Sequence, residues 1–168
     1  MKNKILFSFS FIMICMSIRA QDIFNAARTG NIAQLSSYTS GINNKDSQGY
    51  TPLMLAVYNG NYETSKYLLD HGAFINALDN SGNTALMGAV FKGYTDLVKL
   101  LLTHRASINV QNYNGATALI YAAVFSKPDI VRLLLENKAD KNIKDNMGNT
   151  ALQHALLQDN KEKIILLN

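Results

Sequence analysis

The sequence predicts an all-α fold, a solenoid of stacked helix-turn-helix units joined by turn or hairpin loops. The first observation is a spacing of 33 residues that recurs along the chain. Threonines mark it, each with a glycine two residues before it and a leucine two residues after it: Thr51, Thr84, Thr117 and Thr150. The second observation is that an alanine and a further leucine keep the same phase, five and seventeen residues after each threonine. A self-similarity of this period is typical of repeat proteins in which each unit stacks on its neighbours.

The first twenty residues precede the repeats and have the pattern of a secretory signal peptide. Lys2 and Lys4 come before an uncharged apolar run from Ile5 to Ile18, and Ala20 offers a small residue for cleavage. The run is shorter than the roughly 20 apolar residues of a membrane-spanning helix. We therefore expect cleavage after Ala20, export, and no stable membrane insertion afterwards. An uncleaved membrane anchor is the alternative.

Removal of this segment changes the charge and the cysteine content. The chain has 16 basic and 12 acidic residues, and three of the basic residues lie before position 21, which leaves 13. A nearly neutral chain argues against nucleic acid as a partner, because phosphate binding requires several basic residues on one face. The one cysteine, Cys15, also leaves, so we expect no disulfide and no cysteine-bound metal. Lipidation of Cys15 is disfavoured because Ile14 stands where the bacterial lipidation motif has a small residue.

Each repeated threonine is predicted to begin a first helix. Its hydroxyl can accept a hydrogen bond from a backbone N–H that has no partner within the helix. Pro52 suits the first helical position, because an N–H is not needed there. Leu53, Ala56 and Val57 then share one face of the helix. A second helix, rich in leucine, is predicted to follow the next glycine, which is Gly60 in this repeat.

The repeat divides the chain after residue 20 into five units. Unit 1 is an N-terminal cap, units 2 to 4 are full repeats and unit 5 is a C-terminal cap, with the bounds 21–47, 48–80, 81–113, 114–146 and 147–168. Repeat arrays need polar end caps for solubility, and the helices of unit 1 carry polar side chains. In unit 5, Lys163 takes the phase of Leu97 and Ile130, so we expect a polar end there too.

One column of the first helices pairs the smallest residue with a large one. The column contains Leu55, Gly88, Tyr121 and His154, in phase from unit 2 to unit 5. We expect the ring of Tyr121 to fill the space left at Gly88. A packing role is also expected for His154.

The units resemble the ankyrin repeat, in which a glycine precedes the run Thr-Pro-Leu-His-x-Ala and a Leu-Leu helix follows. Residues 51–56 read Thr-Pro-Leu-Met-Leu-Ala, and the resemblance extends over 22–168 in four copies that share one phase. It implies a protein-binding module. The family's histidine is replaced in all four copies, so we expect apolar packing in place of its hydrogen bonds. The replacing residues are Met54, Met87, Ile120 and Gln153.

The sequence contains no motif of a known enzyme class. It has no H-E-x-x-H, no G-x-S-x-G and no phosphate-binding G-x-x-x-x-G-K-[ST]. His71 and His104 share a phase, but stacked helices lie about 8–10 Å apart, whereas zinc ligands lie about 2.0–2.1 Å from the metal. We therefore expect no enzyme, no catalytic residue, no metal and no cofactor.

In the ankyrin family, partners usually contact the loop tips and the exposed positions late in the first helix. Carried over by phase, these positions give a surface that is rich in aromatic and amide side chains. We call it the recognition surface: Tyr50, Tyr58, Asn59, Asn80, Asn83, Phe91, Lys92, Tyr113, Val124, Phe125, Met147 and Leu157. Aromatic residues are enriched where partners bind. The alternative is that several of these residues belong to the edge of the core.

The sequence therefore favours an exported monomer, in a bacterial periplasm, that binds a protein partner of unknown identity. Two alternatives remain open. One is secretion beyond the cell as an effector that acts on host proteins. The other is a structural role through self-association, using the end of the stack at Ile164 to Leu167.

Overall fold

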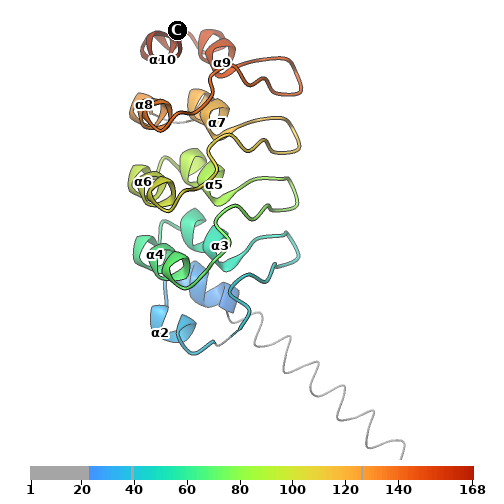
Figure 1. Ribbon diagram of the computed structural model, residues 1–168, viewed down its shortest axis with the longest axis vertical. Helices are drawn as coiled ribbons and strands as arrows, with labels where there is room; N and C mark the ends of the chain where they lie inside the picture. Colours follow the sequence, from blue (N-terminus) through green and yellow to red (C-terminus); the bar gives the residue numbers. More distant parts are fainter. Residues whose placement is uncertain (1–22, 39, 126) are drawn as a thin grey trace, which may run out of the picture.

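The computed structural model describes residues 23–38, 40–125 and 127–168. Its regular elements in these ranges are all helices, stacked in layers along one axis, with a loop projecting to the same side between successive layers (Figure 1). The predicted all-α repeat solenoid is confirmed. The expected signal peptide, 1–20, lies outside the described residues.

First and second helices alternate along the stack. Unit 1 contains a helix that covers 23–29 in the described part, followed by the short α2 (Ile32–Leu35). The first helices of the other units are α3 (Pro52–Tyr58), α5 (Ala85–Lys92), α7 (Ala118–Phe125) and α9 (Ala151–Leu157). Their second helices are α4 (Tyr62–Asp70), α6 (Thr95–Thr103), α8 (Pro128–Glu136) and α10 (Lys161–Leu167).

The first helices begin at the threonines, as predicted. The hydroxyls of Thr51, Thr84 and Thr117 each accept the backbone N–H three residues further on, at 3.3 Å. In unit 5 the cap is reciprocal, because Thr150 accepts the N–H of Gln153 at 3.4 Å and the Gln153 side chain accepts the N–H of Thr150 at 2.6 Å. These bonds fix the same starting point for the first helix of each of these units.

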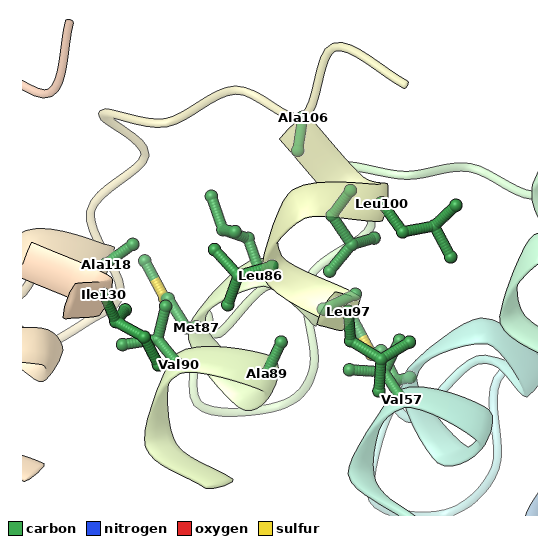
Figure 2. Close-up of a cluster of buried hydrophobic side chains, with 14 of the residues drawn as sticks. Val57, Leu86, Met87, Ala89, Val90, Leu97, Leu100, Ala106, Ala118 and Ile130 are labelled. Atoms are coloured by element: carbon green, nitrogen blue, oxygen red, sulfur yellow. The ribbon is translucent and has the colours of Figure 1, made fainter. Parts of the chain in front are cut away.

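Leucines from both helices of units 2 to 4 form a continuous core. Six of them are at most 1% exposed: Leu53, Leu68, Leu86, Leu101, Leu119 and Leu134. Figure 2 shows side chains of α5 and α6, such as Leu86 and Leu97, lying between those of the two neighbouring units, such as Val57 and Ile130. Each unit therefore buries its apolar side chains both between its own two helices and against its neighbours.

Apolar packing replaces the family's histidine where one unit covers the next. Met54, Met87 and Ile120 are between 1% and 4% exposed, which confirms the expectation for units 2 to 4. Gln153, the fourth member of this column, is exposed and serves the helix cap instead.

Backbone hydrogen bonds join the loop tips from unit to unit. The N–H of Asn80 donates to the C=O of Gln48 at 3.1 Å, and the same bond recurs 33 and 66 residues later. Gly49 and Gly82 lie at these junctions with φ near +80°, and a Cβ there would lie 2.6 and 2.9 Å from the backbone nitrogen of the next unit. The repeated glycine is therefore required both by its backbone conformation and by the close approach of the next loop.

The C-terminal end of the stack differs from the prediction. Lys163 is only 4% exposed, and its Nζ donates to the C=O of Ala123 in α7 at 2.8 Å. The expectation of a polar end at this residue is therefore wrong, because the phase shared with Leu97 and Ile130 directs the side chain into the core. Burial lowers the pKa of the Lys163 ammonium below its ordinary value.

The neighbour predicted for Gly88 is also wrong. A Cβ on Gly88 would lie 2.9 Å from the ring of Tyr58, in the preceding unit, so this ring fills the space. Tyr58 and Gly88 are 30 residues apart, three fewer than the repeat. Tyr58 therefore lies about one helical turn beyond the residue that has the phase of Gly88 in its own unit. Tyr121 is half-buried, and its hydroxyl donates to Asn83 at 3.0 Å.

We expect Gly88→Ala to destabilise the protein only while Tyr58 is present. The added methyl group meets the ring at 2.9 Å, and overpacking of this kind costs about 1–3 kcal/mol. In a Tyr58→Ala background, the same change should raise the free energy of unfolding by about 0.5–1 kcal/mol, because alanine favours a helix more than glycine does. Denaturant unfolding of all four proteins measures the coupling, and additive effects would contradict this contact.

We expect Lys163→Met to raise the free energy of unfolding at pH 7 by about 1 kcal/mol, because an ammonium is no longer desolvated. The folded pKa lies below the unfolded value of about 10.4. Between these two values the unfolded chain binds more protons, so the stability of the unmodified protein rises with pH. The advantage of the variant should therefore shrink as the pH approaches 10. An advantage that stays constant in denaturant unfolding from pH 7 to 10 would show that Lys163 is hydrated.

Candidate recognition surface

The structure places the loops and the first helices on one side of the stack, with the second helices on the other side (Figure 1). Side chains of the same phase therefore form columns along this side. Of the predicted residues, the most exposed large apolar ones are Phe91 (42%), Phe125 (55%), Tyr113 (67%), Leu157 (77%) and Met147 (80%). Asn59, Asn80 and Lys92 are also exposed, whereas Tyr50, Tyr58, Asn83 and Val124 are partly buried.

Three aromatic rings gather at the ends of α5 and α7. The ring centroids of Phe91 and Phe125 are 5.1 Å apart at an interplanar angle of 72°, an edge-to-face arrangement. The Tyr121 ring lies 5.7 Å from Phe125 and 6.4 Å from Phe91. We call Phe91, Tyr121 and Phe125 the ring cluster, which spans units 3 and 4.

Tyr121 is the member of the ring cluster that sequence reasoning did not assign to this surface. The available signal was its position four residues before Phe125, because residues at i and i+4 of a helix are neighbours. Two hydrogen bonds with loop residues also fix the position of the Tyr121 hydroxyl. It donates to Asn83 Oδ1 at 3.0 Å and accepts from Asn112 Nδ2 at 3.2 Å. These bonds hold one edge of the ring cluster against the loops.

Tyr58 has a double role, in the packing of the stack and in its surface. One face of its ring covers Gly88, and Lys92 Nζ lies 5.6 Å from its centroid, a distance typical of a cation–π contact. Tyr50 lies 5.9 Å from the same ring. Burial, reinforced by Tyr50, raises the pKa of the Tyr58 hydroxyl above its ordinary value, so this group stays neutral at physiological pH.

The amide side chains of the predicted surface are bonded within the protein. Asn80 Nδ2 donates to the C=O of Ser47 at 3.0 Å, and Asn59 Nδ2 donates to the C=O of Leu55 at 2.8 Å. Asn83 Oδ1 accepts two side-chain hydrogen bonds. Much of the amide capacity therefore joins loops and helix ends, and the aromatic rings are the larger free part of the surface.

The aspartates of the loop tips are directed into their own turns. Asp46 Oδ1 accepts the N–H groups of Gln48 and Tyr50, both at 2.9 Å. Asp79 and Asp145 accept the equivalent pairs at 2.8–2.9 Å. One oxygen of each of these carboxylates is therefore occupied by backbone donors.

The exposed charges at the last turns of the first helices are basic. They are Arg28, at the end of the first helix of unit 1, and Lys92, at the end of α5. Neither forms an ion pair with any residue that the structure describes. Arg28 also lines a cavity of about 190 Å³ together with Gln48, Tyr50, Leu55, Tyr58 and Asn59. The surface thus has a basic part beside unit 2 and an apolar part over units 3 and 4.

The histidines have structural partners. His154 Nε2 lies 2.7 Å from Asp145 Oδ2, which agrees with the packing role expected for it. Burial alone would raise the pKa of the Asp145 carboxyl, but hydrogen bonds from backbone N–H groups and from His154 lower it below its ordinary value. His71 and His104 each place Nδ1 within 2.9 Å of a carbonyl one turn earlier. Across the described ranges, no group of three or more histidine, cysteine or acidic side chains is arranged to hold a metal ion.

A larger cavity, of about 580 Å³, lies at the beginnings of α4 and α6. It is lined by Tyr62, Tyr94, Asp96 and Lys99 among others, and it contains neither a histidine nor a serine nucleophile. The cavity is separate from the recognition surface. Its size therefore does not by itself indicate a site.

Comparison with known families agrees with the architecture. A family model described as ankyrin repeats, in three copies, matches residues 23–112 and again residues 89–167. None of the curated proteins compared with the chain matches it. Among the described helices, none combines the length and the apolar character needed to cross a membrane. The two matched ranges together cover nearly the whole chain, which therefore belongs to the ankyrin repeat family, whose repeats generally serve as protein–protein interaction modules and are typically non-catalytic.

Proposed function

We propose that this protein is an exported, non-catalytic ankyrin repeat protein that binds a protein partner through the recognition surface. The ring cluster of Phe91, Tyr121 and Phe125 is the observation that carries the proposal. Two of its rings are more than 40% exposed, although they lie beside a core that buries its leucines completely. Exposed apolar groups gathered in this way mark interaction sites more often than scattered ones do.

The geometry of the ring cluster suits it for binding. Aromatic side chains provide a large contact area with few rotatable bonds. The hydrogen bonds that Tyr121 donates to Asn83 and accepts from Asn112 restrict its ring further. A partner therefore loses less affinity to the ordering of this surface. Tyr113, Met147 and Leu157 extend the apolar area to the loop tips and to unit 5.

Export is proposed on the pattern of the first twenty residues and the cysteine content. A basic start, an uncharged apolar run and Ala20 favour a cleaved signal peptide, and the remaining chain contains no cysteine that oxidation could affect. A bacterial periplasm fits this pattern. Secretion as an effector on host proteins is the alternative, and cell fractionation distinguishes the two.

Self-association is a second candidate function, favoured by the end of the stack. Leu156 has the phase of Val57 and Val90, which are fully buried, yet it is 53% exposed in unit 5. Ile165 is 74% exposed at the same end. A second copy stacked there would cover these side chains, and light scattering over a concentration series detects it.

We expect the double variant Phe91→Ala/Phe125→Ala to lose affinity for the partner while keeping its melting temperature. The partner is first identified by affinity capture from an extract of the cell envelope and then titrated in purified form. Each ring that acts as an anchor should cost about 2 kcal/mol or more of binding free energy. Calorimetric titration and thermal unfolding on the same samples separate binding from folding.

The matched control is Phe74→Ala, because Phe74 is 66% exposed but lies outside the recognition surface. It should leave the affinity unchanged. An early melting transition of the double variant would place the rings in the core. Normal folding with normal binding would show that the partner contacts another face.

We expect the exported protein to begin at Gln21, because the apolar run ends before the small residue Ala20. Intact-mass analysis of protein from the periplasmic or culture fraction checks this, with allowance for cyclisation of the terminal glutamine. Retention of Met1, or a lipid on Cys15, would contradict the proposal.

A further inference from the structure

We propose that the recognition surface binds an extended acidic-apolar segment of its partner, with carboxylates beside Arg28 and Lys92 and apolar side chains on the ring cluster. The inference rests on the proposed function and adds to it the chemistry of the partner and the order of its side chains along the recognition surface. Two exposed cations, a small cavity beside Arg28 and the apolar side chains lie at different places along the last turns of the first helices, and this arrangement carries the inference.

Side chains at the ends of the first helices follow a regular order along the stack. The last turns of successive first helices contribute one column that runs from basic through aromatic to aliphatic: Arg28, Tyr58, Phe91, Val124 and Leu157. The adjacent column places Lys92 between Asn59 and Phe125. The two cations therefore flank Tyr58, and the apolar residues occupy the other half.

The cavity beside Arg28 has both apolar and polar walls. Leu55 and the rings of Tyr50 and Tyr58 provide apolar walls, while Arg28 and two amide side chains, Gln48 and Asn59, provide polar groups, around a volume of about 190 Å³. This volume suits one side chain of a partner rather than a small-molecule ligand, since such ligands occupy about 300–1,000 Å³. An aliphatic stem that ends in a carboxylate matches both the walls and the guanidinium, which binds carboxylates in a forked geometry.

The exposed charges at the last turns of the first helices are positive. The aspartates at positions 46, 79 and 145 accept backbone N–H groups of their own turns and form no ion pair with Arg28 or Lys92. Arg28 and Lys92 have no acidic partner within the described part of the chain. An acidic segment complements this surface and a basic one is repelled.

The spacing of the units sets the spacing of the ligand. Stacked helices lie about 8–10 Å apart, and an extended chain advances about 3.3 Å per residue, so one unit corresponds to about three residues. Arg28 lies in unit 1 and Lys92 in unit 3, so a carboxylate in the Arg28 cavity and a second near Lys92 are separated by about six residues. An apolar anchor on the ring cluster, in units 3 and 4, lies within about three residues of the second carboxylate. Two cations at these helix ends are too few for a nucleic-acid backbone, which favours a protein segment.

The test begins with random peptides of about twelve residues, displayed on phage and selected on the purified protein. We expect enrichment of peptides that carry two carboxylates followed or preceded by an aromatic or aliphatic anchor at this spacing. The best peptide is then titrated in two forms, with its acidic residues intact or replaced by glutamine. Peptides enriched without carboxylates, or no enrichment over an unselected library, would overturn the inference.

Charge variants of the protein complete the test. Arg28→Gln/Lys92→Gln should weaken binding of the acidic peptide about tenfold or more and reduce its salt dependence, but should leave the glutamine peptide unaffected. Lys99→Gln, a cation on the second-helix side, is the matched control and should change neither affinity. Equal binding of both peptides to unmodified protein, or competition by an oligothymidine strand, would contradict the inference.

The ring-cluster variant separates this inference from the proposed function. If Phe91→Ala/Phe125→Ala abolishes peptide binding while the charge variant does not, the recognition surface stands and the acidic chemistry is wrong. If only the charge variant abolishes binding, the basic part binds carboxylates and the ring cluster is not the anchor. Loss in both variants, with unchanged melting temperatures, supports both.

Discussion

The stacking of one helix pair on the next is the interaction on which the rest of this structure depends. The two helices of a unit pack on each other, but a single pair does not enclose a core, and the buried side chains form one cluster that runs through the units. The neighbours reduce the exposure of residues such as Leu68, Leu101 and Leu134 to zero. Stability in such an array is approximately the sum of the units and their interfaces. Unit 5 has one interface fewer, which explains why Leu156 is exposed although the Val57 and Val90 of its phase are buried.

The same stacking determines where a binding surface can form. The threonine caps and the loop-to-loop hydrogen bonds fix the height and rotation of each first helix, so residues of the last turn fall into columns. The residue types in these columns differ from unit to unit, because the repeat does not need the same side chain there to form its core. The ring cluster is nevertheless tied to the core architecture, since Tyr121 is bonded to Asn83 of the preceding loop and to Asn112 of its own. Rigidity of the surface is therefore a property of the stack.

The features that the sequence predicted are those that each unit needs locally. A helix needs a cap and a tight junction needs a glycine, so Thr51, Gly49 and their equivalents carry the period. The contacts that it did not predict depend on neighbours. Tyr58 reaches Gly88 because the contact is offset by one turn, which phase alone does not reveal. Lys163 is buried because its position in the stack outweighs the preference of an ammonium for water. On the surface, the columns followed from phase, but the Arg28 cavity and the ring cluster depend on side-chain directions across two units.

The loop aspartates serve the turns rather than the cations at the ends of the first helices. Each tip needs an acceptor for two backbone N–H groups, and Asp46, Asp79 and Asp145 supply it. In unit 3 Asn112 does the same with its Oδ1, at 3.0 Å to each N–H. Since a neutral amide suffices, the role of these residues is hydrogen-bond acceptance rather than charge. The carboxylates are thus directed to the backbone of their own turns, and none of them forms an ion pair with Arg28 or Lys92.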